Sequence, residues 1–377
     1  QVFEGDLDIE RLVLAISAET GVSIEAENTL IIFDEVQEVP KALTSLKYFH
    51  ENAPQYAIVA AGSLLGVALH QGTSFPVGKV DFLDLYPLNF REFLCAMGEK
   101  QFVSMLDSCD TQMVTVFKTK YIERLREYYF VGGMPEVVKD FSEKKDYNRV
   151  RAIQKNLINY YQQDFSKHAE IKLVPRLNLV WNSIPMQLAK ENKKYIYGQV
   201  REGSRAKDFE LAIQWLLDCG LIHKVQRIQK PDLPLKAYID FDAFKLFLVD
   251  IGLLIAMTDL DAKVIIEGNK IFTEFKGSLT EQYILQQLIS DVGVIPYYYS
   301  TQNSKGEIDF LVQGKTSVIP IEVKAEENLK AKSLKAFCEK YQPSYAVRTS
   351  MSDYREQDWM TNIPLYAIKW IENYVNQ

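Results

Sequence analysis

Cysteine and histidine are scarce in this chain. Four of each occur among its 377 residues, and no two cysteines form a C-x-x-C pair. Such sparse and scattered cysteines are typical of a reduced cytosolic protein, and they exclude a disulfide-stapled secreted domain. The histidines are equally scattered along the sequence, so a histidine-based metal site is not expected.

Long apolar runs and an excess of positive charge are also missing. No apolar segment approaches the length of a membrane helix and no signal peptide begins the chain, so we expect a cytoplasmic protein with no membrane partner. The 43 lysines and arginines are outnumbered by 50 aspartates and glutamates, which gives a formal net charge of −7. A globally basic nucleic-acid binder is therefore not expected, although a local basic face stays open. The 47% hydrophobic and 25% charged residues are typical of a globular protein, and the length predicts two or three domains.

Two adjacent carboxylates end an apolar run early in the chain. The run "TLIIFDE" (29–35) is followed by a helical period and then by a second apolar run, "YAIVAAGS" (56–63). The order strand, helix, strand predicts parallel strands whose carboxyl ends lie at one edge of a sheet. We therefore expect Asp34, Glu35 and Ser63 to meet in one crevice there. The alternative is a buried strand whose acids cap the next helix or face solvent.

This stretch also carries a family resemblance. The segment "LIIFDEVQEVPKALTSLKYFHENAPQYAIVAAGSLLGVAL", with "VDFLDLYPLNFREFL" after it, resembles the ATPase domain of prokaryotic AAA+-like P-loop ATPases that have a characteristic C-terminal extension. The resemblance implies ATP and Mg²⁺ as cofactors and a Walker B pair in which Asp34 holds the metal and Glu35 is catalytic. It places Ser63 at a sensor position for the terminal phosphate. It implies for Arg91 either nucleotide sensing or a structural ion pair.

A phosphate-binding loop is absent from the printed sequence. The motif G-x-x-x-x-G-K-[ST] does not occur, because both glycine–lysine pairs, at 78–79 and 314–315, lack the glycine five positions earlier. In the family this loop lies upstream of Walker B, so the first strand, the loop and the first helix are expected to precede Gln1. Without the backbone N–H groups and lysine of that loop, we do not expect the 377-residue chain to bind ATP appreciably.

The middle of the chain predicts a helical region that ends in a winged-helix-like arrangement. A helix that Ser204 can cap and that Gly220 ends is followed by the strand "LIHKVQRI" and by a further strand and helix. Basic residues that could contact DNA phosphates stand near the would-be recognition helix and on the wing, at Arg201, Arg205, Lys207, Lys224 and Arg227. The alternative is a packing module between domains. It is slightly favoured, because the basic residues are few and interleaved with acids.

The last stretch predicts a helix, a strand and a hairpin. Glu281 stands near the start of the helix "GSLTEQYILQQLISD", and the hairpin "GEIDFLVQGKTSVIPIEVKAEEN" turns near residue 314. Alternation along the strands puts Glu322 and Lys324 on one face, and Asp309 opposite its apolar neighbours. Two carboxylates and a lysine can thus converge on the polar side of the hairpin. Pro320 cannot donate to a ladder and predicts an edge strand or a bulge.

An Asp followed by Glu-x-Lys, with a helical Glu before them, resembles the PD-(D/E)XK nuclease fold. In that pattern Asp309 and Glu322 would hold Mg²⁺, Glu281 would complete the metal site, and Lys324 would be catalytic by helping to activate water. The segment also resembles the restriction-endonuclease-like C-terminal domain of the same ATPase family. The alternative is an exposed hairpin with an ordinary charge pair, in a docking module whose protein uses nucleotide as a switch.

The expected fold class is α/β, in three regions. Residues 1–95 would form a partial P-loop NTPase parallel sheet, residues 96–265 the helical and winged-helix-like middle, and residues 266–377 the PD-(D/E)XK nuclease-like domain. DNA is the candidate partner, and a homo-oligomer stays open.

Overall fold

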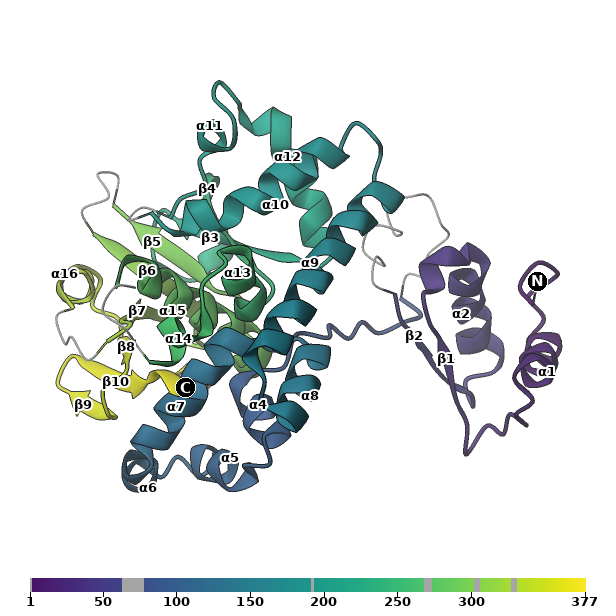
Figure 1. Cartoon of the computed structure of the whole chain (residues 1–377), viewed down its shortest axis with the longest axis horizontal. Coiled ribbons are helices and arrows are strands. Elements are labelled where there is room, and N and C mark those ends of the chain that lie inside the picture. The colour runs from purple at the N-terminus through teal and green to yellow at the C-terminus, as the bar shows by residue number, and fades with distance from the viewer. Residues whose placement is uncertain (1, 63–77, 191–192, 268–272, 302–305, 327–330) are drawn as a thin grey trace. The chain divides into compact units, whose positions relative to one another are not determined.

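The computed structural model describes residues 2–62, 78–190, 193–267, 273–301, 306–326 and 331–377 (Figure 1). The chain divides into two compact units. One consists of Gln1–Leu85 and Gln214–Leu221, and the other of Tyr86–Ile213 and Ile222–Gln377. None of the helices in these described parts combines the length and the hydrophobicity that crossing a membrane requires.

The first unit contains the expected strand, helix and strand. Its elements are α1 (Ile9–Thr20), β1 (Leu30–Phe33), the 3₁₀ turn η1 (Val36–Glu38), α2 (Pro40–Asn52) and β2 (Ala57–Ala60). The two strands pair in parallel, with Leu30 opposite Ala57 and Phe33 opposite Ala60. Pro40 opens α2, where a missing backbone N–H leaves no helical hydrogen bond unmade. The predicted parallel β-α-β unit is confirmed.

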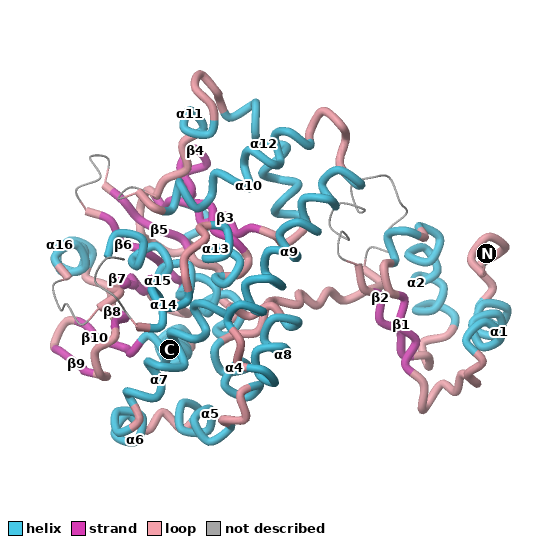
Figure 2. The backbone as a smooth tube through the Cα atoms, viewed as in Figure 1, coloured by secondary structure: helices cyan, strands magenta, loops and turns pink. Residues whose placement is uncertain are grey.

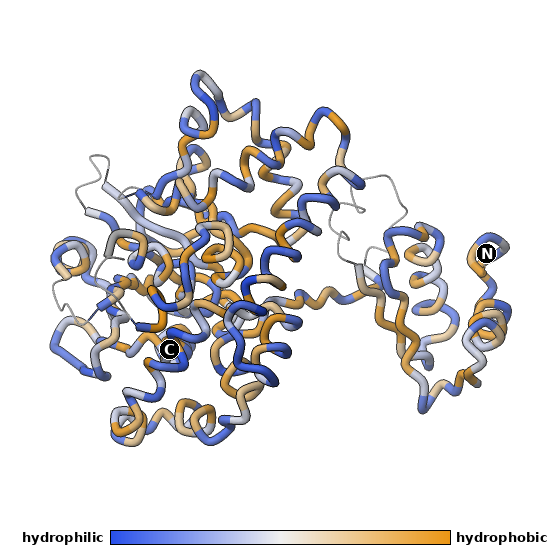
Figure 3. Tube along the Cα trace, viewed as in Figure 1, coloured by the Kyte–Doolittle hydropathy of each residue, from blue (hydrophilic) through white to orange (hydrophobic). Residues whose placement is uncertain are grey.

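The two faces of the β1–β2 sheet differ in exposure. Ile31 is 6% exposed, whereas Leu30, Ile32 and Val59 are 54%, 60% and 48% exposed. Both strands are hydrophobic along their length (Figure 3). The covered face belongs to a small core shared with helices α1 and α2, in which Phe49 is buried. Strands of parallel sheets are usually buried on both faces, so the exposed side of this pair is an apolar surface.

The second unit begins with a series of helices, which lie beside its strands in Figure 2. They are α4 (Phe90–Ala96), α5 (Lys100–Asp107), α6 (Thr111–Val116), α7 (Lys118–Val131), α8 (Pro135–Lys144), α9 (Tyr147–His168), α10 (Val174–Leu188) and α11 (Tyr197–Val200). Helix α12 (Ala206–Asp218) begins in this unit and forms over the stretch that was predicted to be an amphipathic helix.

Later elements of this unit alternate between strands and helices. They are β3 (Ile222–Ile228), η2 (Leu235–Tyr238), β4 (Ile239–Leu248), α13 (Ile251–Met257), α14 (Ala262–Ile266), α15 (Thr273–Gln287), the π-helical turn η4 (Leu288–Val292), β5 (Tyr297–Ser300), β6 (Glu307–Gln313), β7 (Val318–Val323), α16 (Lys332–Tyr341), β8 (Val347–Ser350), β9 (Arg355–Gln357), β10 (Met360–Pro364), η5 (Leu365–Ile371) and α17 (Glu372–Val375).

Eight strands of the second unit form one mixed sheet in the order β4-β3-β5-β6-β7-β8-β10-β9. Strand β3 pairs antiparallel with β4 and parallel with β5, where Arg227 lies opposite Tyr298. The strands expected as a wing are therefore continuous with the strands of the C-terminal stretch, and the expected regions 96–265 and 266–377 both contribute to this sheet. A DNA-contacting role for the basic residues near the wing stays a prediction.

The predicted hairpin is confirmed, but the interpretation of its proline is wrong. Strands β6 and β7 pair antiparallel with Phe310 opposite Ile321, and the turn lies between residues 313 and 318. Pro320 lies in a strand that has β6 on one side and β8 on the other. Pairing of β7 with β8 starts only at Ile321. The missing N–H of Pro320 therefore precedes that ladder, which removes the need for an edge or a bulge.

Three glycines allow close backbone contacts in the second unit. A Cβ on Gly133 would lie 2.1 Å from the carbonyl oxygen of Leu88, and one on Gly132 would lie 2.2 Å from an Asp250 carboxylate oxygen. A Cβ on Gly252 would lie 2.5 Å from the carbonyl oxygen of Val131. Asp250, fully buried, caps α13 by accepting from the Leu253 N–H at 3.0 Å, and it accepts from the Gly133 N–H at 2.6 Å. This contact ties the turn after α7 to the start of α13.

Candidate functional site

The carboxyl edge of the β1–β2 pair is the first candidate site. Asp34 and Glu35 follow β1 directly, and both are exposed. Two backbone hydrogen bonds connect the segments that follow β1 and β2. The Ala61 N–H donates to the Phe33 carbonyl at 2.8 Å, and the Val36 N–H donates to the Ala61 carbonyl at 3.0 Å. The carboxylates therefore lie at the edge where ligands bind in parallel sheets. Ser63, expected beside them, lies outside the described residues.

Local geometry holds the two acids in a tight turn. Asp34 Oδ1 accepts from the Glu35 backbone N–H at 3.0 Å. Glu35 has a φ of 48°, in the left-handed region that few non-glycine residues adopt. The Gln37 amide donates to the Glu35 carboxylate. Backbone conformations of this kind are concentrated at functional sites because the surrounding structure must enforce them.

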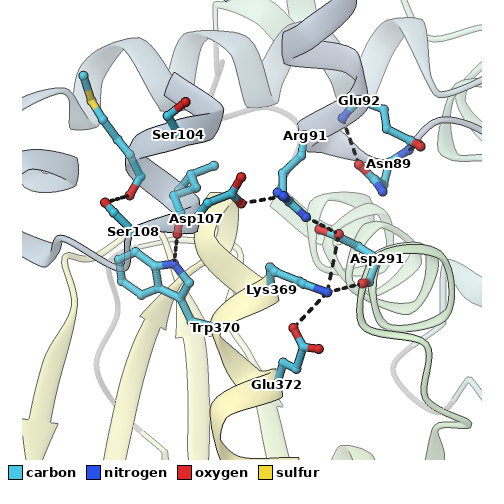
Figure 4. A network of polar contacts seen from close by, with 12 residues as sticks. Asn89, Arg91, Glu92, Ser104, Asp107, Ser108, Asp291, Lys369, Trp370 and Glu372 are labelled. Atoms are coloured by element: carbon cyan, nitrogen blue, oxygen red, sulfur yellow. Dashed lines mark hydrogen bonds and ion pairs between the residues drawn. The ribbon is translucent and has the colours of Figure 1, made fainter. Parts of the chain in front are cut away.

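Arg91 belongs to the second unit, where it joins a network of ion pairs (Figure 4). Its guanidinium lies 2.5 Å from Asp107 of α5 and 2.9 Å from Asp291 of η4. Lys369 of η5 also donates to the backbone carbonyl of Asp291, at 2.6 Å. Burial raises the pKa of Asp291, and Arg91 opposes this. These contacts are those of the structural ion pair, whereas nucleotide sensing by Arg91 stays a prediction.

The four residues expected in the C-terminal stretch meet in one cluster. Glu281 comes from α15, Asp309 from β6, Glu322 from β7, and Lys324 from the residue after Val323 at the end of β7. The Lys324 ammonium lies 2.6 Å from Glu322 Oε1, and the Val323 N–H donates to Asp309 Oδ2 at 2.7 Å. The side chains of Asp309 and Glu281 lie close enough to influence each other's ionisation. The polar face of the hairpin and the helix above it thus supply one buried, charged site.

Three further charged residues of the cluster were not expected from the sequence. Lys245 of β4 is fully buried, with its Nζ 2.5 Å from Glu307 Oε1 and 3.7 Å from Glu281 Oε2. Lys193, from the chain between α10 and α11, pairs with the other oxygen of Glu281. The one signal in the sequence was a lone lysine inside the apolar strand "FKLFL" (244–248). Nothing local marked Lys193 or Glu307, because their partners are far away in the sequence.

Among the carboxyl groups of this cluster, Asp309 has the pKa that is shifted furthest upward. Burial raises the pKa of Asp309 well above its ordinary value, and the neighbouring carboxylates of Glu281 and Glu322 raise it further. Burial opposes ionisation of Glu281 too, but Lys193 and Lys245 together outweigh it and lower the pKa of that carboxyl. Protonation of Asp309 would relieve the repulsion between these crowded carboxylates.

The donor atoms of the cluster suit a hard cation such as Mg²⁺. Glu281 Oε2 and Glu322 Oε2 are buried without a hydrogen-bond partner, and carboxylate oxygens are the ligands that Mg²⁺ prefers. As the side chains stand, however, lysine ammonium groups contact two of the three expected metal ligands, Glu281 and Glu322. Within the described ranges, no group of three or more His, Cys, Asp or Glu side chains is arranged to hold a metal ion. A divalent cation would therefore have to displace a lysine from its carboxylate, because the ligands are not already arranged around an open metal site.

The two candidate sites lie in segments that match different family models. Residues 3–94 match the family model of an AAA domain. Asp34, Glu35 and Arg91 fall inside that segment. Residues 122–264 and 276–368 match models of two domains of unknown function, DUF8612 and DUF4143, and the charged cluster draws its four expected members from the second of these.

Whole-chain comparisons add little to these matches. No curated protein matches the chain. Among solved structures, the Walker-type ATPase of Pyrococcus abyssi is similar over 67% of this chain and 68% of its own, at 14% sequence identity and a TM-score of 0.41.

Proposed function

We propose that the AAA-domain segment is part of an ATP-hydrolysing core. Asp34 would hold the Mg²⁺ that accompanies the nucleotide, and Glu35 would orient and polarise the attacking water. Ser63 would sense the terminal phosphate. The observation that carries this proposal is the pair of exposed carboxylates at the carboxyl edge of a parallel β-α-β unit, in the segment that matches the AAA domain.

Adjacent acids can divide these two tasks because their surroundings differ. Asp34 is the first residue after β1, at the strand tip where a metal-bound phosphate would lie. Glu35, the next residue, has a left-handed backbone conformation, so its side chain leaves the chain in a different direction from that of a residue in an extended strand. Exposure of both leaves room for water and nucleotide phosphates. Solvent would also have to be excluded during hydrolysis, which a bound nucleotide and the remainder of an ATPase core would achieve.

ATP binding and turnover test this proposal. Calorimetry on the 377-residue chain should show no micromolar affinity for ATP, because its sequence has no phosphate-binding loop. A version of the protein that carries a phosphate-binding loop ahead of Gln1 should bind and hydrolyse ATP. In that protein, Glu35→Gln should retain ATP binding and lose about 100-fold or more in turnover, since a water-orienting charge is removed.

The matched control is Glu27→Gln, which changes another exposed glutamate ahead of β1. It should bind and hydrolyse ATP as the unmodified protein does. Turnover by Glu35→Gln at the unmodified rate would show that Glu35 has no catalytic role.

A second candidate function is metal-dependent hydrolysis of a phosphodiester, with DNA as the substrate. It is favoured by the meeting of Glu281, Asp309, Glu322 and Lys324 in one buried cluster. The three carboxylates would hold Mg²⁺, which when bound supplies an activated water and neutralises developing charge. Lys324, 32% exposed, lies at the open side of the cluster, where it can contact water or a phosphate. The alternative is a docking module whose charged cluster only stabilises the fold, in a protein that uses nucleotide as a switch.

Lys324→Ala distinguishes catalysis from docking. The variant should bind Mn²⁺ at least as tightly as the unmodified protein in calorimetry, because lysine is not a metal ligand and its ammonium contacts Glu322. Cleavage of supercoiled plasmid DNA should fall by about 100-fold or more, since the group that activates water is lost. Lys276→Ala removes a lysine of α15 that pairs with Glu326 at 3.1 Å, and this variant should cleave normally. If the unmodified protein binds Mn²⁺ and cleaves nothing, the docking module replaces the nuclease.

A further inference from the structure

Two lysines contact Glu281, and they are held very differently. Lys245 has a fully buried side chain on β4, contacts Glu307 as well as Glu281, and lies over the ring of Tyr298 at 4.8 Å from its centroid. Lys193 comes from irregular chain between two helices, keeps 12% of its side chain exposed, and pairs with Glu281. Lys245 is therefore a fixed part of the sheet, whereas Lys193 lies at the periphery of the cluster.

The backbone around Lys193 is anchored on one side. The Tyr195 N–H donates to the Phe244 carbonyl at 2.8 Å, and the Gln187 amide donates to the Ile196 carbonyl at 2.9 Å. These bonds fix the start of α11 next to β4 and place residue 193 within reach of α15. The ammonium of a side chain with four rotatable bonds can leave Glu281 without any change in those bonds.

Glu281 is also the carboxylate with a spare oxygen. Its Oε1 is taken by Lys193, while Oε2 has no hydrogen-bond partner and is 3.7 Å from Lys245. A divalent ion approaching this carboxylate would meet the Lys193 ammonium in direct contact with the same group. A divalent ion on Oε2 would be repelled by the Lys193 ammonium on Oε1 and by Lys245, so its binding would be weaker while Lys193 is in place.

We propose that Lys193 is the exchangeable counter-cation of Glu281, and that it competes with a divalent ion for the charged cluster. While Lys193 is in place the cluster is neutralised by its own lysines. When the ammonium moves out to solvent, Glu281 joins Asp309 and Glu322 as a ligand. This inference rests on the metal site proposed above, and it assigns to Lys193 control over access of the metal to that site.

Lys193→Met tests the exchange, because methionine keeps the length of the side chain and removes its charge. Calorimetry with Mn²⁺ alone should show an affinity about tenfold or more above that of the unmodified protein. Lys194→Met is the matched control, with the same change of charge at the neighbouring position. It should alter the Mn²⁺ affinity by about twofold or less, since the charge of Lys194 acts on Asp240 rather than on Glu281.

Thermal melting in metal-free buffer gives a second measurement. Lys193→Met should lower the melting temperature, because Glu281 loses a contact charge, and the loss should shrink when Glu281→Gln is already present. Saturating Mn²⁺ should restore the melting temperature of Lys193→Met.

The outcomes separate the inference from the function on which it rests. Equal Mn²⁺ affinity in Lys193→Met and the unmodified protein would overturn the competition and leave the metal site standing. Absence of Mn²⁺ binding from both proteins would overturn the metal site and the competition with it.

Discussion

Replacing Gly133 by alanine is expected to lower the free energy of unfolding by about 3 kcal/mol or more and the melting temperature by roughly 6–12 °C. The added Cβ would lie 2.1 Å from the Leu88 carbonyl oxygen and 2.9 Å from the Leu88 nitrogen. Both atoms belong to the backbone, so no side chain can rotate away to make room.

The surroundings of Leu88 prevent a compensating shift. Its N–H donates to the Gly133 carbonyl at 2.8 Å, and its carbonyl accepts from the buried Tyr128 hydroxyl at 2.5 Å. On the other side of the glycine, the backbone N–H is bound to the buried carboxylate of Asp250. Relieving the clash would break at least one of these buried hydrogen bonds, each of which leaves an unsatisfied group.

Gly198→Ala is the matched control for this change. Gly198 is exposed in α11, and a Cβ there meets nothing within 4 Å. Alanine favours a helix by about 1 kcal/mol over glycine, so this variant should melt at or slightly above the unmodified temperature. The measurement is a comparison of the melting temperatures of the two variants by calorimetry. A Gly133→Ala protein that melts like the control would show that the two backbone segments separate easily.

Asp309→Asn is expected to abolish metal binding and, in metal-free buffer, to stabilise the protein. The expected loss of Mn²⁺ affinity exceeds the roughly 10–100-fold that changes to outer-shell partners cost. The gain in stability is expected because asparagine has nearly the same shape as aspartate and carries no charge. Asparagine resembles a protonated aspartate, so its amide can donate to Glu281 and its carbonyl can accept from the Val323 N–H.

The stabilisation by Asp309→Asn should depend on pH. Burial, Glu281 and Glu322 raise the pKa of Asp309 well above its ordinary value. A raised pKa in the folded state means that the favourable contribution of the protonated carboxyl is complete below the ordinary aspartate pKa of about 4 and is lost as pH rises through the folded value. Asparagine cannot ionise, so its advantage in melting temperature should grow from acidic to alkaline pH.

Melting curves of Asp309→Asn from pH 5 to pH 9 measure this effect. Asp358→Asn changes an exposed aspartate in the same unit and should show no growing difference from the unmodified protein. A constant difference across the pH range for Asp309→Asn would mean that the cluster accommodates a fourth ionised carboxylate at no cost.

Periodicity predicted the elements that carry both candidate sites. The apolar runs before Asp34 and at 57–60 became a parallel pair, since strand, helix, strand has few other solutions. Alternation along "IDFLVQ" and "IPIEVK" placed Asp309, Glu322 and Lys324 on one side of the hairpin, because side chains of a strand point to opposite faces in turn. Such local rules depend only on neighbours in the sequence.

The remaining features depend on partners that no local rule identifies. Lys193 and Lys245 reach Glu281 from segments 88 and 36 residues away along the chain. Pro320 was misinterpreted because its place in the middle of a sheet depends on where the β8 ladder begins. The ion pairs of Arg91 with Asp107 and Asp291 could be imagined from the sequence but not chosen over nucleotide contacts.

Recombination that replaced one of the two matched segments of the second unit would disrupt the sheet that both segments build. Strand β3, from the segment 122–264, pairs through Arg227 and Ile228 with Tyr298 and Tyr299 of β5, from the segment 276–368. A segment acquired from another lineage would have to reproduce this ladder or leave an aromatic strand edge open to other chains. The two segments are therefore expected to descend together as one heritable unit, whatever happens to the domain that precedes them.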